Sequence, residues 1–314
     1  MSRLETVLVT GGAGFIGSHL VEALVGEGYT VRVLDNLATG HRSNLAYLEG
    51  RYEWIEGDLA DLDTCKRATE GVAYVFHQGA IPSVPRSVRD PIESHLSGPT
   101  ATLNILEAAR LAGVRRVMFA ASSAAYGDTI ELPKHEGMLP NPLSPYAAGK
   151  LAGEHYIAVY ARTMGLDGVS LRYFNIFGPR QDPSSPYSGV ISLFIKFMSQ
   201  GQRPTIYGDG CQTRDFTYVA NVVAANLAAM RSPEPLRGEV FNVGTGQRIS
   251  LLDLVASLNR IFGTSLEPVF QPPRAGDVRD SLASLERIEK VLGYRPLVPF
   301  EEGLRRTVAA SVGR

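Results

Sequence analysis

The chain has 314 residues, of which 44% are hydrophobic and 20% charged, a composition typical of a globular protein with a substantial core. Its 31 Lys and Arg residues balance 32 Asp and Glu residues, so the charge favours neither a nucleic acid nor an anionic membrane as partner. Two cysteines are too few for a disulfide scaffold or a thiolate metal cage. No apolar run approaches the ~20 residues that cross a bilayer, and the start leaves no room for a signal peptide, so we expect a cytoplasmic protein.

The first 175 residues alternate short apolar runs with helical patterns. Strands are predicted at 6–10, 30–35, 52–55, 74–77, 116–121 and 169–174, and helices at 15–25, 61–70, 100–112 and 146–164. Because the strand runs are almost continuously apolar, they are typical of parallel strands covered on both faces. The alternation predicts an α/β fold with a doubly wound parallel Rossmann sheet.

The rest of the chain has longer Pro- and Gly-rich connections and shorter elements. We therefore predict a dinucleotide-binding Rossmann domain over residues 1–175 and a smaller C-terminal substrate-binding domain, mainly over 176–314. Open α/β sheets bind ligands at the carboxyl ends of their strands, which the smaller domain is expected to cover. Stretches within 215–244 are expected to return to the first sheet.

A glycine trio with the spacing G-x-x-G-x-x-G follows the first predicted strand, at Gly11, Gly14 and Gly17. The first glycine allows a tight turn, the second lets the backbone approach a pyrophosphate, and the third allows close helix packing. The helix that follows offers N–H groups to the anion. Asp35 ends the next strand, where its carboxylate can bind both ribose hydroxyls and repel a 2′-phosphate. This pattern predicts NAD rather than NADP as cofactor.

The segment SPYAAGK at 144–150 predicts the start of a catalytic helix. Ser144 is a good N-cap and Pro145 suits the first helical position, so Tyr146 and Lys150 lie four residues apart on one face. A phenol with a pKa near ~10 is a poor base at neutral pH, and a neighbouring ammonium and the positive nicotinamide ring lower that value. The alternative is an amphipathic helix with a packed Tyr and a solvent-directed Lys.

A third catalytic group is expected where the fifth strand ends, in the run ASSAAYG at 121–127. We predict that Ser122 shares the substrate's proton with Tyr146; Ser123 is the competing choice, and two serines that merely cap a strand end are the alternative. His77, at the end of the fourth strand, is predicted to be a packed strand-end residue. Gly149 lies inside the catalytic helix at a cost of up to ~1 kcal/mol relative to Ala, and only close approach to a neighbour offers a reason for it.

With these motifs in this order, the chain resembles the extended short-chain dehydrogenase/reductase family of NAD-dependent epimerases and dehydratases over nearly its full length, and most of all its UDP-glucose and UDP-N-acetylglucosamine 4-epimerases. By this resemblance, Asn175 in RYFN touches the UDP phosphates, Arg214 and Arg274 bind the diphosphate, Asp277 binds the UDP ribose, and Tyr207 packs near uracil. Two arginines suit a diphosphate, which near-neutral overall charge would not attract.

The resemblance implies a reversible oxidation at C4 of the sugar. Tyr146 removes the 4-OH proton while Ser122 shares the hydrogen bond, hydride passes to NAD, the 4-keto sugar turns, and hydride returns to its opposite face. Ser123-Ala124 stand where sugar dehydratases carry an Asp–Glu pair and decarboxylases carry a Glu at the second position, so both reactions are disfavoured.

By the same resemblance, Ser281 indicates which substrates fit. It corresponds to the position beside the sugar's 2-substituent, where a small residue admits an N-acetyl group. UDP-Glc/UDP-Gal and UDP-GlcNAc/UDP-GalNAc both remain candidates. Alternatives are a UDP-glucuronate 4-epimerase, with Arg180 and Ser188 receiving the carboxylate, another nucleotide-sugar oxidoreductase, and a non-catalytic dinucleotide sensor. The resemblance also implies a homodimer that pairs through the helices at 100–112 and 146–164.

The chain departs from the family at 95–99, where HLSGP replaces the usual N-V-x-G-T. Asp58 is either a contact to the adenine edge or a simple turn residue. The predicted cofactor-binding residues are Gly11, Gly14, Phe15, Ile16, Gly17, Asp35, Asn36, Asp58, Leu59, Gly79, Ala80, Tyr146, Lys150 and Tyr173. The predicted substrate-binding residues are Ser83, Ser122, Ser123, Asn175, Val190, Tyr207, Arg214, Arg274, Asp277 and Ser281, and no metal ligand is predicted.

Overall fold

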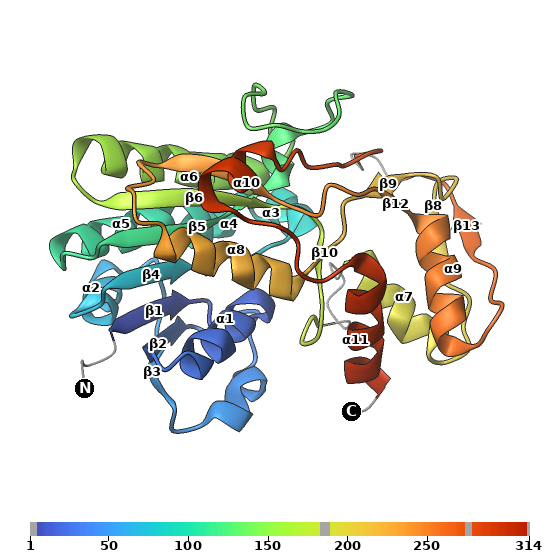
Figure 1. Ribbon diagram of the computed structural model, residues 1–314, viewed down its shortest axis with the longest axis horizontal. Helices are drawn as coiled ribbons and strands as arrows, with labels where there is room; N and C mark the ends of the chain where they lie inside the picture. The colour runs from blue at the N-terminus through green and yellow to red at the C-terminus, as the bar shows by residue number, and fades with distance from the viewer. Residues whose placement is uncertain (1–4, 183–188, 274–277, 313–314) are drawn as a thin grey trace. The chain divides into compact units, whose positions relative to one another are not determined.

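The computed structural model describes residues 5–182, 189–273 and 278–312, drawn as ribbon in Figure 1. The chain forms two compact units. The first unit consists of Met1–Ala125, Pro142–Arg172 and Val223–Phe241. The second unit consists of Tyr126–Asn141, Tyr173–Val222 and Asn242–Arg314.

A seven-stranded sheet forms the centre of the first unit. Its strands are β1 Thr6–Thr10, β2 Thr30–Asp35, β3 Tyr52–Glu56, β4 Tyr74–His77, β5 Arg116–Ser122, β6 Asp167–Tyr173 and β11 Glu239–Val243. They lie in the order β11-β6-β5-β4-β1-β2-β3. Strand β1 pairs in parallel with both β2 and β4, so the sheet is wound outward in two directions from this point. The predicted doubly wound Rossmann fold is confirmed.

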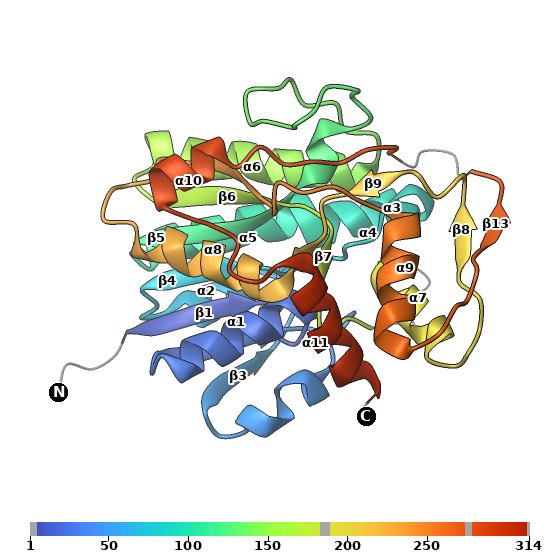
Figure 2. The ribbon, with the colours of Figure 1, turned by 45° about the vertical axis from the view of Figure 1, so that its right-hand side comes forward.

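Helices cover both faces of this sheet. The first unit carries α1 Phe15–Gly26, η1 Arg42–Leu48, α2 Leu62–Thr69, α3 Val84–Arg89, α4 Pro91–His95, the π-helical turn η2 Leu96–Thr100, α5 Ala101–Leu111, η3 Ser123–Tyr126 and α6 Pro145–Thr163. The helices α2, α5 and α6 pack side by side on one face, and α1 and α8 (Val219–Arg231) lie on the other (Figure 1, Figure 2). The predicted helix at 100–112 continues a longer run that begins at α4.

Alternating residues of the parallel strands bury aliphatic side chains against the helices. Leu8, Val75 and Val117 are fully buried and pack with Ile105 of α5 and Ile157 of α6. Each such side chain contributes ~1.5–3 kcal/mol of burial free energy. The central strands therefore form a rigid platform, and their carboxyl ends hold the loops described below in fixed positions.

The chain returns to the first sheet as β11, which lies beside β6. Arg116 binds the segment that leads back into β11. Its guanidinium is paired with Asp167 at 2.5 Å and donates to the carbonyl oxygens of Ala229 at 2.7 Å and Glu234 at 2.7 Å. Asp167 in turn accepts a bond from the backbone N–H of Arg237 at 2.8 Å. One buried cation thus connects β5, β6 and the end of α8.

In its described residues, the second unit contains three small two-stranded sheets and four helices. Its strands pair as β7 Ile176–Phe177 with β10 Thr217–Tyr218, β8 Thr205–Tyr207 with β13 Val269–Gln271, and β9 Thr213–Arg214 with β12 Ile249–Ser250. Its helices are α7 Val190–Met198, α9 Leu251–Phe262, α10 Glu286–Leu292 and α11 Phe300–Val312. An aromatic cluster of Phe177, Phe216, Tyr218 and Phe300 forms part of its core.

The segment Tyr126–Asn141, which lies within the predicted first domain, belongs to the second unit. Its partners are far away in sequence. The Tyr126 hydroxyl donates to Asn242 Oδ1 at 2.6 Å, and the backbone of Lys134 bonds to Leu282 at 2.7 Å and to Ser284 at 2.8 Å. Such pairings leave no local pattern in the sequence.

Within the described ranges, no helix is both long and apolar enough to cross a membrane. The same residues contain no group of three or more His, Cys, Asp or Glu side chains that could hold a metal ion.

Candidate active site

The glycine turn between β1 and α1 has a shape that larger residues cannot adopt. Gly11 has a φ of 64°, and a Cβ atom there would lie 2.8 Å from the Gly79 backbone. A Cβ atom at Gly17 would lie 2.1 Å from the Gly11 carbonyl oxygen. Gly14 is the N-cap of α1 and has no side chain to cap the first-turn N–H groups, where Phe15 and Ile16 begin the helix. This helix end is therefore suited to an anion such as a pyrophosphate.

Asp35 sits at the end of β2 with its carboxylate directed at the glycine turn. Its two oxygens accept bonds from the N–H groups of Ala13 at 2.9 Å and Leu37 at 2.8 Å. Burial raises the pKa of this carboxyl, and the backbone bonds oppose that rise. Each oxygen keeps lone-pair capacity, because a carboxylate offers about four acceptor sites. The geometry suits a ribose diol.

Asp58, after β3, is tied into local structure. Its Oδ2 accepts a bond from the Asn36 side-chain amide at 3.0 Å, and its Oδ1 accepts one from the Ala60 N–H at 2.8 Å. Leu59 Cδ1 lies where it would meet a Cβ atom at Gly79 at 2.4 Å. These contacts place Asp58 and Leu59 in the turn that backs the glycine loop.

His77 closes a buried polar chain at the end of β4. Thr10 Oγ1 bonds to His77 Nδ1 at 2.8 Å and accepts the Gly79 N–H at 3.1 Å, while His77 Nε2 meets Thr102 Oγ1 at 3.2 Å. The imidazole stacks on Phe119 with ring centroids 5.6 Å apart. Burial, with Lys150 nearby, lowers the pKa of His77 to about 3. The ring is neutral and packed, as the sequence predicts.

Helix α6 begins as the SPYAAGK segment predicts. The Ser144 side chain accepts the Ala147 N–H at 3.2 Å, and Pro145 is the first helical residue. Burial raises the pKa of the Tyr146 phenol, and the side chain of Ser122, the last residue of β5, lowers it. Ser123 begins the short helix η3.

Lys150 is almost fully buried, with 6% of its surface exposed. Its ammonium donates to the Ala120 carbonyl at 2.7 Å and lies 5.0 Å from the Phe119 ring centroid and 6.0 Å from that of Tyr146. Burial lowers the Lys150 pKa to about 8, and the charge of Glu154 works in the opposite direction. The cation is therefore held near the phenol in a region of low dielectric, where its field is strong.

Glu154 and Arg172 were not among the predicted site residues. Their side chains form a buried two-bond pair at 2.8 and 2.7 Å that ties α6 to β6. Glu154 lies one turn after Lys150, so i+4 spacing from the lysine was the signal available in the sequence. The pair holds the catalytic helix against the sheet and places a negative charge beside Lys150.

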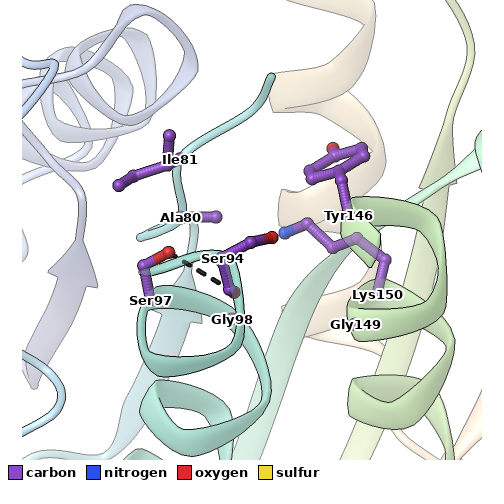
Figure 3. Close-up of a pocket in the computed structure, with 8 residues that line it drawn as sticks. All are labelled: Ala80, Ile81, Ser94, Ser97, Gly98, Tyr146, Gly149 and Lys150. Atoms are coloured by element: carbon purple, nitrogen blue, oxygen red, sulfur yellow. Dashed lines mark hydrogen bonds between the residues drawn. The ribbon is translucent and has the colours of Figure 1, made fainter. Parts of the chain in front are cut away.

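A small pocket opens beside the tyrosine and lysine (Figure 3). Its walls come from the first unit alone. One wall is α6, the facing wall is the helical run through η2, and the third is the loop after β4. The lining residues are Ala80, Ile81, Ser94, Ser97, Gly98, Tyr146, Gly149 and Lys150. Of these, Ala80, Tyr146 and Lys150 were predicted to bind the cofactor.

Ser83 and Tyr173 complete the predicted residues near the sheet. The Ser83 side chain caps α3 by accepting the Arg86 N–H at 3.1 Å. Tyr173 is the last residue of β6 and is 8% exposed. Arg274, Asp277 and Ser188, which the sequence also singles out, lie outside the described residues.

The remaining predicted substrate residues belong to the second unit. Arg214 in β9 donates from Nη1 to the carbonyl oxygens of Thr213 and Arg279 at 2.9 and 3.0 Å. Ser281 is 9% exposed and donates its N–H to Thr213 at 3.2 Å, which brings it beside the Arg214 strand. Tyr207 ends β8, Val190 begins α7, and Asn175, with a φ of 23°, follows β6.

Asp215 is a third residue that sequence reasoning did not select. It is fully buried and accepts bonds from Thr245 Oγ1 at 2.7 Å and from the N–H groups of Thr245, Gly246 and Ala283 at 2.8, 3.0 and 3.2 Å. Burial raises the pKa of this carboxyl, while these bonds lower it. Asp215 thereby joins the Arg214 segment to the segment that carries Ser281.

Residues 7–244 match the model of the NAD dependent epimerase/dehydratase family. The chain is 40% identical to the UDP-glucose 4-epimerase of Mycolicibacterium smegmatis, with 96% of each chain covered. It is also similar to the solved UDP-N-acetylglucosamine 4-epimerase of Methanobrevibacter ruminantium M1, with 37% identity, 99% of each chain covered and a TM-score of 0.94.

A third relative is the UDP-glucuronic acid 4-epimerase of Bacillus cereus, solved with UDP-glucuronic acid and NAD, with 32% identity, coverage of 98% and 99%, and a TM-score of 0.91. These similarities confirm the predicted NAD cofactor and the predicted class of enzyme, an epimerase-type isomerase. The chain belongs to the NAD dependent epimerase/dehydratase family.

Proposed function

We propose that this protein interconverts the C4 epimers of a UDP-hexose through a transient 4-keto sugar. The observation that carries the proposal is that Tyr146 and Lys150 line one pocket, with the Lys150 ammonium 6.0 Å from the centre of the phenol ring, while the Ser122 side chain lowers the pKa of the phenol. A phenol that can give up and regain a proton is what an alcohol–ketone interconversion requires.

NAD fits the residues present in the first unit. The glycine turn packs backbone against backbone more closely than Cβ atoms at Gly11 and Gly17 would allow, and the Asp35 carboxylate stands beside it. In our proposal these groups hold the pyrophosphate and the adenosine ribose, and Lys150 holds the nicotinamide ribose. Bound NAD supplies a reversible acceptor for the hydrogen at C4.

Tyr146 moves the proton of the 4-hydroxyl. Burial raises its pKa above the ordinary value, and in our proposal the Lys150 ammonium and the positive nicotinamide ring of NAD favour the phenolate. Ser122, whose side chain lowers the Tyr146 pKa, stabilises the developing phenolate and shares the substrate hydroxyl. Tyr146 returns the proton once the ketone has presented its other face.

The UDP group anchors the substrate, and the sugar ring is held loosely enough to turn. We assign Arg214 and Arg274 to the diphosphate and Asp277 to the UDP ribose, with Asn175, Tyr207 and Val190 as further contacts. Fixed guanidinium groups suit a diphosphate because they bind two oxygens at once. Binding energy concentrated on the non-reacting nucleotide leaves the sugar free to rotate.

We further propose that UDP-Glc/UDP-Gal and UDP-GlcNAc/UDP-GalNAc are both substrates. The small Ser281 side chain supports this, because it leaves room for a 2-acetamido group. The variant Ser281→Tyr is expected to depress turnover of UDP-GlcNAc selectively, and retained turnover of UDP-Glc serves as the internal control for folding. Equal loss of both activities would contradict this assignment of Ser281.

A UDP-glucuronate 4-epimerase is the second candidate, and the likeness to the Bacillus cereus enzyme favours it. Arg180, whose backbone lies in the left-handed region at a φ of 67°, is a candidate for the sugar carboxylate. Formation of UDP-galacturonate from UDP-glucuronate would support this candidate, and its absence would exclude it. Retention of both Tyr146 and Lys150 argues against a non-catalytic dinucleotide sensor.

The deciding experiment incubates the purified protein separately with UDP-Glc, UDP-GlcNAc and UDP-glucuronate and identifies the products by NMR. We expect the C4 epimer from at least one of the two hexoses, with no added NAD, and release of NAD on denaturation. A protein that converts none of the three would overturn the proposed function.

We also propose a homodimer that pairs through α5 and α6, and a cytoplasmic location. Apolar side chains on these adjacent helices are exposed, including Leu103, Leu111, Val159 and Met164. Cys65 and Cys211 are both free thiols, as in a reducing compartment. Light scattering on the purified protein tests the dimer: a monomer mass at micromolar concentration would exclude it.

A further inference from the structure

A π-helical turn interrupts the run from α4 to α5, and its sequence gives the cause. Pro99 lies inside η2, has no N–H to donate, and its ring would clash with the carbonyl four residues earlier in a regular α-helix. The backbone widens instead, and the N–H of Ala101 reaches back five residues to Leu96. Single π-helical turns of this kind occur frequently at functional sites.

Gly149 of α6 faces this turn at close range. A Cβ atom at Gly149 would lie 3.1 Å from Pro99 Cδ and 3.4 Å from Pro99 Cγ, and the proline is buried. At such distances one neighbour must move by a few tenths of an ångström to admit a methyl group. The contact supplies the reason, missing from the sequence, for a glycine that costs the helix up to ~1 kcal/mol.

The two residues lie within the pocket-forming segments. Gly149 stands between Tyr146 and Lys150, and η2 contributes Ser97 and Gly98 to the facing wall (Figure 3). On the sheet side, Lys150 is fixed by the Ala120 carbonyl at 2.7 Å. The start of α6 is therefore held between the end of β5 and the proline ring.

We propose that Pro99 and Gly149 are positioning residues for the catalytic helix. Their contact sets how closely the first turns of α6 approach η2, and through this the placement of Tyr146 and Lys150 in the pocket. The expected fall in kcat rests on the proposed epimerase activity. The expected displacement of α6 rests on the contact between Pro99 and Gly149 alone. A displacement approaching 1 Å can cost ~100-fold in rate, so a shift of a few tenths is expected to cost several-fold.

The test is a double-mutant cycle between Gly149→Ala and Pro99→Ala. Gly149→Ala adds one methyl group toward the proline and raises helix propensity, so it is expected to lower kcat about fivefold to tenfold without lowering Tm. KM for the UDP-sugar is expected to stay within about twofold, because the added methyl group displaces the reacting groups and removes no binding contact. In the Pro99→Ala background, where the ring is absent, the same change is expected to alter kcat by less than about twofold.

Gly26→Ala is the matched control. It makes the same change at the last residue of α1, where a Cβ atom would meet nothing within 4 Å, and is expected to leave kcat unchanged. An unchanged kcat in Gly149→Ala, or an equal loss in both backgrounds, would refute the positioning role.

A crystal structure of Gly149→Ala separates this inference from the proposed function. A parent protein that converts no UDP-sugar refutes the function. The inference then depends on the position of α6 and on the hydrogen bond from Lys150 to the Ala120 carbonyl in the variant. A displaced start of α6 supports it, and an unmoved helix with this bond at its parental length overturns it.

Discussion

At the scale of single residues, burial decides how Tyr146 and Lys150 behave. Burial raises the Tyr146 pKa and lowers the Lys150 pKa to about 8, so each group alone is pushed toward its neutral form. When the phenol ionises next to the ammonium, each charged form stabilises the other, because opposite charges at close range attract strongly in a medium of low dielectric. The carboxylate of Glu154 helps to keep the lysine charged.

Removal of the lysine charge is therefore expected to damage the base as well as the cofactor contact. For Lys150→Met we expect kcat to fall by ~10²–10⁴-fold, the range of general-base catalysis. The acidic limb of the kcat–pH profile should move to higher pH, because the phenol then keeps its raised pKa and less phenolate is present at a given pH. Lys66→Met, at an exposed lysine of α2, is the control. A profile that keeps its parental midpoint would contradict this role for Lys150.

His77 is expected to make stability depend on pH. Its pKa is lowered from 6.5 to about 3 in the folded protein. Between pH 6.5 and pH 3 the unfolded chain therefore protonates this histidine, whereas the folded chain keeps it neutral. Stability contributed by the neutral ring is therefore full above pH 6.5 and is lost as pH falls toward 3. At 1.36 kcal/mol per pH unit, the loss between pH 7 and pH 5 amounts to about 2 kcal/mol.

Urea unfolding at pH 7 and pH 5 measures this effect. In His77→Asn, which cannot titrate in this range, the difference in unfolding free energy between the two pH values should shrink by about 2 kcal/mol. The variant is less stable at both pH values because it loses the stacking on Phe119. An undiminished difference would show that other groups cause the pH dependence.

At the scale of elements, Arg116 joins three parts of the first unit that are distant in sequence. Its pairing with Asp167 is buried, and its donations to carbonyl groups fasten the end of α8. Arg116→Ala leaves a mostly buried carboxylate and several carbonyl groups without their donor, and we expect a loss of ~3–5 kcal/mol in unfolding free energy. Denaturant titration gives the value.

Arg110→Ala is the comparison for this prediction. Arg110 pairs with Glu107 on the same helix, with about a third of each side chain exposed, so the expected loss is below ~1 kcal/mol. Similar losses in the two variants would mean that the Arg116 contacts contribute little beyond an ordinary surface pair.

At the scale of the whole molecule, the proposal gives the two units separate tasks. NAD is assigned to residues of the first unit, and the UDP diphosphate to Arg214 and other residues of the second. Arg214→Ala is therefore expected to weaken UDP binding by ~10–100-fold, the 1.5–3 kcal/mol of a charge-assisted bond, with an unchanged content of bound NAD. Calorimetry with UDP and absorbance after denaturation provide the two measurements. Loss of NAD in this variant would show that the tasks are not separable.

The sequence by itself determined the features that depend on short spacings. Periodicity in the first 175 residues predicts the strands of the sheet to within a few residues, because each strand buries both of its faces. The glycine turn, Asp35 and the Tyr146–Lys150 pair could be selected for the same reason: their geometry follows from one turn or one helix. Family and cofactor follow from these local motifs.

Only the tertiary structure decided which distant residues meet. Glu154 finds Arg172, Asp215 joins segments near 245 and 283, and the segment 126–141 pairs with 282–284. Gly149 was visible as an anomaly in a helix, but Pro99, fifty residues earlier, explains it. Partners of this kind are chosen by packing across the folded chain, where sequence separation carries no information, and so no local pattern could reveal them.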